Sequence, residues 1–280
     1  MQSERPVITL LTDFGLDGAA AVCRGVMLGI CRDAQIVDIA HTIRKYAIAD
    51  GAFVLRISLP HMPIGVHVAV VDPGVGTERR AIGIRAGRGD VLIGPDNGLL
   101  IPAAEAMGGI AESRRLENRG LWLAPETSST FHGRDIFSPV AAHLAAGDAE
   151  FEDVGAPIPP DELVRLPMLP TSARAGLLET AVAYVDSFGN LRLAATPVDL
   201  RVAVGELETG RQLTVEFLPT DGGPAHREST HFAATFGRVP PGESLVYIDS
   251  DGDVAFADSQ GNAAARLRVA AGRPVRILPG

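Results

Sequence analysis

An aspartate and two arginines flank a short loop rich in glycine and proline, in the stretch VVDPGVGTERR. Asp72 ends a run of β-branched residues, and Arg79 and Arg80 follow seven and eight positions later. A carboxylate at the end of a buried strand must find a hydrogen-bond donor or stay protonated, and an arginine that returns across the loop supplies that donor. Gly74 and Gly76 permit the close approach of a ligand, but the GK[ST] ending of a phosphate loop is absent. These residues alone favour a salt-bridged turn and a site for water or an anion equally.

A second candidate is His132, in the stretch TFHGRD just ahead of a helix expected to begin near Asp135. A single histidine is more often a hydrogen-bonded structural group than a catalyst. Here the histidine lies in a loop beside Gly133 and Arg134 instead of on an apolar helix face. Functional residues are common in loops, and imidazole titrates near neutral pH, so the position favours a catalytic role.

Two further stretches fit the recognition of a nucleoside. Asp13 ends the first expected strand in LLTDFG, where carboxylates of dinucleotide-binding folds accept hydrogen bonds from ribose hydroxyls. No GxGxxG follows, so an ordinary NAD site is not expected. VDSFGN combines Asp186, Phe188 and Asn190 in a turn. As a site it offers an aromatic face for a base and an amide for the edge of that base, but any tight β-turn has the same composition.

Alternating strand-like and helix-like segments position these residues in the first half of the chain. Apolar periodicity predicts, in chain order, a strand at 7–14, a helix at 18–34, a strand at 35–40, a helix at 47–59 and a strand at 65–72. Such alternation indicates βαβ units and a mainly parallel sheet covered by helices. Asp13, Asp38 and Asp72 then mark the strand ends, and ligand sites of open α/β sheets lie at the carboxyl ends of strands.

A proline-rich stretch divides the chain. It ends the α/β pattern at 152–176, and short alternating strands separated by turn residues follow it. We therefore predict a Rossmann-like α/β domain at 1–165, a linker at 166–176 and a small C-terminal β-barrel domain at 177–280. The expected strands of the second domain include RVAVGEL at 201–207 and ARLRVAAG at 265–272.

Composition limits the classes of partner. Of the 280 residues, 46% are hydrophobic and 21% charged, as in globular proteins, and no apolar run reaches the roughly 18 residues that cross a membrane. The formal charge is −9 and Lys45 is the only lysine, so no basic stripe for nucleic acid is present. Cys23 and Cys31 form no CxxC motif, and the first residues lack the pattern of a signal peptide. We expect a cytoplasmic protein with reduced thiols.

Motifs for metals and for serine hydrolases are not matched. The seven histidines form neither an HxxxH nor an HExxH pattern, and no GxSxG is present. DSDGD at 249–253 resembles the start of a calcium loop. However, the sixth position is Val254 instead of glycine, and the twelfth is Gln260 instead of glutamate. We expect a solvated turn there, and no metal.

Five motifs in the same order and at similar spacing closely resemble those of the S-adenosylmethionine (SAM) hydrolases, also called SAM hydroxide adenosyltransferases, a family related to the fluorinases and chlorinases: TDFG, DPGVGTERR, GPDNGLL, TFHGRDIFSPVAAHLAAG and DSFGN. The match runs from about Val7 to the C-terminal strands. The resemblance implies an N-terminal α/β domain, a C-terminal β-barrel and a homotrimer. It also implies active sites at subunit interfaces, between one N-terminal domain and a neighbour's C-terminal domain.

The resemblance also implies roles for individual positions. The family's water-activating triad is matched by Asp72, Arg79 and His132. Asp13 matches the acid that holds the ribose hydroxyls, and Asp186 matches a residue near the methionine ammonium. The adenine contacts are matched by Phe188 and Asn190, and the substrate-binding set also includes Gly133 and Ala264, the latter in the small-residue loop QGNAAA. One departure is clear. The threonine and asparagine that usually follow DSFGN in the family are replaced here by LRLAAT.

The implied reaction is hydrolysis of SAM to adenosine and L-methionine by in-line attack of water at ribose C5′, with no cofactor. The sulfonium already makes methionine a good leaving group, so the enzyme has to hold the reacting atoms about 3–3.5 Å apart and remove a proton from the water. Either His132 or Asp72 can act as the base, with Arg79 keeping Asp72 ionised. The alternatives are a SAM-dependent halogenase, whose known members carry tyrosine in place of Asp72, a non-catalytic SAM or adenosine sensor, and a purely structural trimer.

Overall fold

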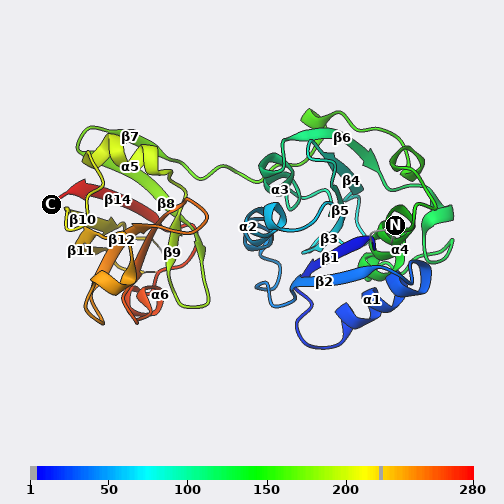
Figure 1. Cartoon of the computed structure of the whole chain (residues 1–280), viewed down its shortest axis with the longest axis horizontal. Coiled ribbons are helices and arrows are strands. Elements are labelled where there is room, and N and C mark those ends of the chain that lie inside the picture. Colours follow the sequence, from blue (N-terminus) through cyan, green and yellow to red (C-terminus); the bar gives the residue numbers. More distant parts are fainter. Residues whose placement is uncertain (1–4, 221–222) are drawn as a thin grey trace. The chain divides into compact units, whose positions relative to one another are not determined.

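Two compact units make up the chain (Figure 1). The computed structural model describes residues 5–220 and 223–280, and the first unit ends at Leu166 while the second begins at Pro167. This division falls inside the stretch 166–176, for which we predict a linker. Within that stretch, Ser172–Arg174 forms strand β7, because its backbone pairs with the strand that follows it.

The first unit is a sheet with helices on both faces. Its elements in chain order are β1 (Val7–Thr12), α1 (Ala19–Ile30), β2 (Gln35–Ala40), α2 (Ile48–Ser58), β3 (Val66–Val70), β4 (Ala81–Ala86), β5 (Val91–Pro95), α3 (Ile101–Ala106), β6 (Ile110–Arg115) and α4 (Ser138–Ala146), with 3₁₀ turns at Leu59–His61, Arg119–Leu121, Phe151–Val154 and Pro160–Glu162. The strand order is β2-β1-β3-β5-β4-β6. Strands β2, β1, β3 and β5 are parallel, which confirms the predicted α/β arrangement.

Strand β4 is the exception to a uniformly parallel, Rossmann-like sheet. It runs antiparallel to both β5 and β6. The physical reason is the connection at 87–90 between β4 and β5, because so short a turn joins only antiparallel neighbours.

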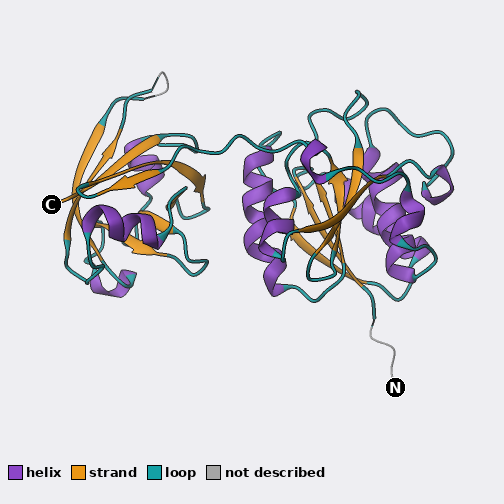
Figure 2. Cartoon of the chain, turned by 90° about the horizontal axis from the view of Figure 1, so that it is seen from above, coloured by secondary structure: helices purple, strands orange, loops and turns teal. Residues whose placement is uncertain are grey.

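Apolar side chains alternate between the two faces of this sheet. Ile8 and Leu10 of β1 pack with α1 and α4 on one face, whereas Leu11 packs with α2 and α3 on the other. Figure 2 shows the helices on both sides of the strands. Strands β1 and β3 lie side by side with Thr12 opposite Val70, so the residues that follow both strands emerge at the same edge of the sheet.

A polar network joins β1 and β3 to the turn before β5, and its Thr9, His67 and Asp90 side chains are fully buried. Thr9 Oγ1 lies 3.0 Å from His67 Nδ1, and His67 Nε2 donates to Asp90 Oδ1 at 2.9 Å. Arg88 donates from Nε and Nη2 to the same carboxylate at 2.7 and 2.8 Å. Burial alone raises the pKa of Asp90, but the hydrogen bonds from Arg88 and His67 outweigh it and hold that pKa far below its usual range.

The second unit is a barrel. Its elements in chain order are β7, β8 (Leu177–Val185), β9 (Leu191–Leu193), α5 (Pro197–Val204), β10 (Gln212–Phe217), β11 (His226–Phe232), a 3₁₀ turn at Phe236–Arg238, β12 (Ser244–Ile248), β13 (Val254–Asp258), α6 (Ala263–Leu267) and β14 (Pro274–Pro279). In the described part of this unit, seven strands in the order β14-β10-β11-β12-β13-β9-β8 close through the pairing of β14 with β8, and β7 extends the sheet beside β8. The predicted β-barrel is confirmed.

Two segments expected to be strands contain no strand, and each begins within a helix. RVAVGEL overlaps α5, where Thr196 accepts a hydrogen bond from the backbone of Asp199 and the Asp199 side chain accepts one from the backbone of Thr196. ARLRVAAG overlaps α6, which begins where Asn262 Oδ1 accepts the Ala265 N–H at 2.7 Å. Both strand predictions are wrong because an apolar run this short fits either conformation, and the capping residue just before it decides.

Candidate active site

The side chains of Asp72, Arg79 and His132 meet beyond the end of β3. Arg79 donates to Asp72 Oδ1 from Nε at 3.1 Å and to Oδ2 from Nη2 at 2.5 Å. The same Nη2 lies 3.0 Å from His132 Nδ1. The Arg79 and Asp72 side chains are only 7% and 4% exposed. The structure therefore brings together the three residues proposed as a triad.

A glycine allows the two loops that carry the triad to touch. Gly76 has a positive φ of 76°, and a Cβ at this position would collide with the carbonyl oxygen of Ser129. The loop after Asp72 is tied by a bond from Thr77 Oγ1 to the Gly74 carbonyl at 2.7 Å. Only a residue without a side chain fits at position 76, so this glycine sets the distance between the Asp72 loop and the His132 loop.

A π-helical turn, Gly133–Phe137, follows His132 and leads into α4. Asp135 in this turn accepts the backbone N–H of Ser128 at 2.7 Å, and Arg134 donates to the same carboxylate. Ser138 Oγ donates to the Gly133 carbonyl at 2.7 Å. These bonds hold the loop before His132 against the helix, which fixes the imidazole.

The proton arrangement of His132 follows from its neighbour. A guanidinium has only donors, so the Nδ1 that faces Arg79 must accept, and the neutral ring carries its proton on Nε2. Burial lowers the pKa of His132, and the positive charge of Arg79 lowers it further, although Asp72 acts in the opposite direction. The neutral ring is therefore favoured at neutral pH.

A small cavity of about 80 Å³ opens between the triad and the end of β1. Its wall consists of residues from the two strand ends and the His132 loop, together with Tyr46: Asp13, Phe14, Tyr46, Val70, Asp72, Val75, Thr130, Phe131, His132 and Gly133. Four predicted site residues of the first unit, Asp13, Asp72, His132 and Gly133, thus share one cavity. It has room for water but is far smaller than the roughly 300–1,000 Å³ of ligand pockets.

Asp13 and Tyr46 line the same cavity and are joined by a hydrogen bond. Asp13 is 8% exposed, and its Oδ2 accepts the backbone N–H of Tyr46 at 2.9 Å. Tyr46 has a positive φ of 65° and leaves its side chain 70% exposed. Tyr46 is not predictable from the sequence, since no local motif marks a residue whose backbone bonds to a strand end 33 positions away.

Arg80, next to Arg79, has a different partner. It donates from Nε to Asp96 Oδ2 at 2.8 Å, and Asp96 Oδ1 accepts the Val164 N–H at 2.9 Å. This ion pair ties the start of β4 to the end of β5, and the Val164 bond adds the segment after the 3₁₀ turn Pro160–Glu162. Of the two arginines in the opening motif, Arg79 holds two side chains that line the cavity, those of Asp72 and His132, whereas Arg80 belongs to the scaffold.

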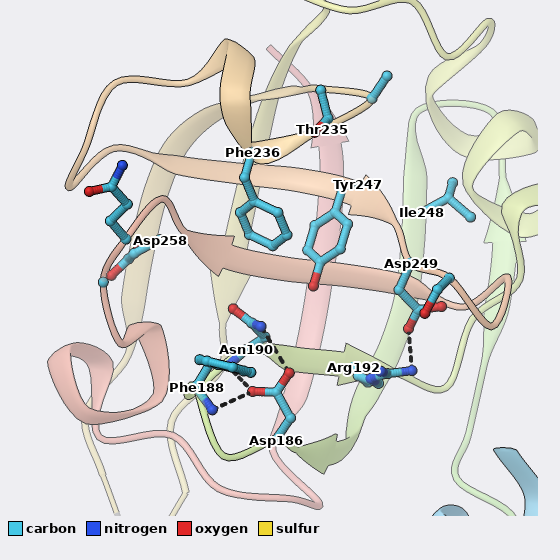
Figure 3. Close-up of a pocket in the computed structure, with 14 residues that line it drawn as sticks. Asp186, Phe188, Asn190, Arg192, Thr235, Phe236, Tyr247, Ile248, Asp249 and Asp258 are labelled. Atoms are coloured by element: carbon cyan, nitrogen blue, oxygen red, sulfur yellow. Dashed lines mark hydrogen bonds and ion pairs between the residues drawn. The ribbon is translucent and has the colours of Figure 1, made fainter. Parts of the chain in front are cut away.

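The second unit holds a larger cavity of about 770 Å³ (Figure 3). Predicted site residues Asp186, Phe188 and Asn190 line it. Asp186 Oδ1 accepts the backbone N–H groups of Phe188 and Asn190, both at 2.9 Å, and its Oδ2 accepts Asn190 Nδ2 at 2.8 Å. These bonds fix the turn and leave the Phe188 ring 74% exposed.

Four further residues of this cavity were missed by the sequence analysis: Arg192, Phe236, Tyr247 and Asp249. Figure 3 shows the rings of Phe236 and Tyr247 side by side, with centroids 4.8 Å apart. Burial raises the pKa of Tyr247 to about 12, with a further contribution from the carboxylates of Asp186 and Asp249. The alternation of side chains along LVYID could have indicated two of these residues. It places Tyr247, in β12, and Asp249, which directly follows β12, on the same face.

The expectation of a solvated DSDGD turn is wrong for its first residue. The Asp249 side chain is 4% exposed, and its Oδ2 lies 2.7 Å from Arg192 Nη1. Its Oδ1 accepts the N–H groups of Asp251 and Asp253 at 2.9 Å. The turn itself forms as expected, but its first residue, Asp249, forms a buried ion pair with Arg192 of β9.

Ala264 lies next to the turn that carries Phe188. Its N–H donates to the Gly189 carbonyl at 3.0 Å, and its side chain packs against the barrel core instead of lining the cavity. Gly189 has a positive φ of 84°, and a Cβ there would collide with Asn262, the cap of α6. Ala264 therefore supports the position of the turn through its backbone.

Neither a metal centre nor a membrane span is seen in the described ranges. Among residues 5–220 and 223–280, no three His, Cys, Asp or Glu side chains are grouped to hold a metal ion. None of the helices in the same ranges combines the length and the apolar character needed to cross a bilayer. Cys23 and Cys31 are both buried and form no disulfide.

Comparisons with known proteins cover almost the whole chain. Residues 8–155 match the model of the SAM hydroxide adenosyltransferase N-terminal domain, and residues 180–276 match that of the C-terminal domain. The chain is 44% identical over 276 residues to the (R)-S-adenosyl-L-methionine hydrolase of Salinispora arenicola, with 98% of each protein covered. It is 29% identical over 299 residues to a fluorinase of Actinoplanes sp., with 97% of each covered. A crystal structure of an uncharacterized conserved protein from Thermotoga maritima superposes with a TM-score of 0.86 at 34% identity, covering 97% of this chain and 99% of that one.

Proposed function

The chain belongs to the SAM hydroxide adenosyltransferase family, and on this premise we propose that it hydrolyses S-adenosyl-L-methionine to adenosine and L-methionine. The observation that carries the proposal is the group formed by the buried side chains of Asp72 and Arg79 and the partly buried His132, beside a cavity with room for water. The Asp72 carboxylate is held by the Arg79 guanidinium, and it lines the space where a nucleophile would lie.

At ribose C5′ the reaction makes one bond, to the water oxygen, and breaks one bond, to sulfur. The water oxygen attacks ribose C5′ in line with the sulfonium, the C5′–S bond breaks, and its electron pair remains on sulfur as the neutral thioether of methionine. One proton leaves the water. Because the sulfonium loses its charge without any redox change, the chemistry calls for no cofactor, and positioning of the water alone contributes about 7–11 kcal/mol in well-oriented systems.

Asp72 is the proton acceptor in this proposal. Arg79 is always protonated, and the neutral His132 accepts at Nδ1 and already carries a proton on Nε2. Of the three groups, the Asp72 carboxylate therefore has acceptor capacity left for the water. His132 then acts as a donor that orients the water oxygen, and Arg79 orients both of its neighbours.

The substrate contacts divide between the two cavities. We assign the ribose hydroxyls to Asp13 and the adenine face to the exposed ring of Phe188. The amide nitrogen of Asn190 is taken by Asp186, so its oxygen is the atom that can accept a hydrogen bond from the adenine amino group. We assign the methionine ammonium to Asp186 and close backbone approach around the substrate to Gly133, whereas Ala264 supports the Phe188 turn through its bond to Gly189.

A homotrimer with active sites at subunit interfaces completes the proposal. A cavity of about 80 Å³ cannot enclose SAM, so the triad needs a second surface to exclude bulk water. The C-terminal cavity of a neighbouring copy, with its exposed Phe188, offers that surface. Tyr46, which lines the small cavity, is 70% exposed, and Leu16, three positions after Asp13, is 90% exposed. Light scattering coupled to size exclusion chromatography tests this, with an expected mass of about three times 29.4 kDa.

The two buried free cysteines favour a reducing compartment, and we propose a cytoplasmic location.

The deciding experiment follows products of SAM by liquid chromatography and mass spectrometry. The hydrolase reaction predicts equal amounts of adenosine and methionine, with ¹⁸O from labelled water at the adenosine 5′ position. Parallel reactions with chloride or fluoride test for 5′-halo-adenosine, which a halogenase would form. If calorimetry detects SAM binding while no adenosine appears above the buffer control, the protein is a sensor and the proposal fails.

A further inference from the structure

Arg192 is the one cation among the residues that line the C-terminal cavity, all of which lie in the described part of the chain. Three carboxylates share the lining with it: Asp186, Asp249 and Asp258. Asp258 is matched by Arg266, which donates to both of its oxygens at 2.7 and 2.9 Å. Arg266 is not a lining residue, so the charge of Asp258 is compensated from outside the cavity. Arg192, by contrast, brings its positive charge into the cavity.

Strand geometry places Arg192 beside the proposed adenine contacts. Asn190 and Arg192 are two positions apart at the start of β9, so their side chains point to the same face, about 7 Å apart along the strand. Leu191 and Leu193 point to the other face and are buried in the barrel core. Figure 3 shows Arg192 and Asp249 at one end of the cavity, Phe188 and Asn190 farther along it, and the Tyr247 ring between them.

The Arg192 side chain is held rigidly. It is 14% exposed, and its Nη1 lies 2.7 Å from Asp249 Oδ2 and 2.5 Å from Asp251 Oδ2. Asp249 in turn accepts two backbone N–H groups of its own turn. A guanidinium fixed in this way loses little conformational entropy when it binds a further group, which is the condition for a selective contact.

The charges at this end of the cavity fit the amino acid end of SAM. Asp249 and Asp251 face Arg192 at this end, whereas Asp186 is hydrogen-bonded to the turn that carries Phe188 and Asn190. The methionine moiety carries two cations, the sulfonium and the α-ammonium, and one anion, the α-carboxylate. The carboxylates of the cavity suit the two cations, and the anion needs a cationic partner, which among the lining residues is Arg192.

We propose that Arg192 binds the α-carboxylate of the methionine moiety and thereby selects an intact amino acid end in the substrate. This inference rests on the proposed function, whose hydrolase site it extends to the methionine end. Arg192 belongs to LRLAAT, the stretch in which the chain departs from the usual threonine and asparagine of the family. The role is one of substrate recognition, since Arg192 contacts no reacting atom in this scheme.

The test compares SAM with its decarboxylated analogue, which keeps the sulfonium and the amine but has no α-carboxylate. Calorimetric Kd and, where turnover occurs, KM and kcat are measured for the wild type and for Arg192→Met. We expect the variant to weaken binding of SAM about 10–100-fold, the scale of a hydrogen bond to a charged group, and to change binding of the analogue less than threefold. The kcat for SAM should change much less than KM.

Arg266→Met is the matched control, because it removes an arginine that pairs with a cavity carboxylate from outside. It should shift both ligands by the same factor. Arg192→Lys keeps a cation and should restore part of the preference for SAM, which also covers the case in which Arg192→Met does not fold. Equal losses for the two ligands would show that Arg192 only pins the 249–253 turn, and unchanged SAM binding would also overturn the inference. Because Kd is read without turnover, a protein that binds SAM but fails to hydrolyse it refutes the proposed function separately.

Discussion

Asp72→Asn tests whether the carboxylate beyond β3 accepts the proton of the attacking water. The asparagine has nearly the same size, and its amide oxygen can still accept one of the two hydrogen bonds from Arg79. It no longer carries a negative charge, and it no longer binds a proton in the relevant range. The substitution therefore separates charge and basicity from shape.

Two magnitudes follow from the structure. Loss of a positioned proton acceptor lowers kcat by about 10²–10⁴-fold, which corresponds to about 3–5 kcal/mol of activation free energy. Removing one partner of a buried ion pair costs about 3–5 kcal/mol of folding stability, and both side chains here are less than a tenth exposed. We expect the lower end, about 3 kcal/mol, because the amide retains one bond to Arg79. Binding of SAM should change less than about threefold, since Asp72 contacts the water and not the substrate in the proposed mechanism.

The assay combines adenosine formation under saturating SAM, calorimetric SAM binding and urea denaturation. Asp96→Asn is the matched control, because the Arg80–Asp96 pair has the same chemistry, with Asp96 only 2% exposed, but lies outside the cavity. We expect a similar loss of stability and a kcat within about threefold of the wild type. The reasoning is refuted if Asp72→Asn keeps more than a tenth of the wild-type kcat, or if both variants lose activity to the same extent.

Three further predictions concern the loops and the buried charges. Because burial and the neighbouring guanidinium lower the pKa of His132, protonation costs more in the folded protein than in the unfolded chain; stability should fall as pH drops below about 6.5, and urea denaturation of His132→Gln should lack this part of the pH dependence. Gly76→Ala adds a collision with Ser129 to the strain of a positive φ and should lower kcat at least tenfold, whereas Gly147→Ala, with a nearly equal φ of 74° and open space around its Cβ, should reduce only the melting temperature. The pKa of Asp90 lies below its ordinary value of 3.8, so its stabilisation is present above that pH and lost below it; Asp90→Asn should lower stability at neutral pH by about 3–5 kcal/mol and flatten the acid limb of a urea-denaturation series.

Much of the fold and of the triad is determined locally. Apolar residues fix the strands of the first unit, and an aspartate follows the ends of β1 and β3, which is why Asp13 and Asp72 are visible as site candidates in the sequence. Turn residues mark the strand boundaries of the barrel. By contrast, α5 and α6 were assigned as strands, because a short apolar run is compatible with either conformation until its capping residue is considered.

Which residues meet was decided by the tertiary structure. Arg79 and His132 are 53 positions apart, and their contact depends on Gly76 fitting against Ser129. Arg79 and Arg80 are equivalent in the sequence, yet the register of β4 directs one to Asp72 and the other to Asp96. The larger cavity likewise collects side chains from β9, β12 and the loops around them, including a guanidinium that no motif marks. Periodicity and propensity act over a few residues, whereas these contacts depend on how distant segments pack, so the sequence alone determined the chemical groups and the folded chain determined their partners.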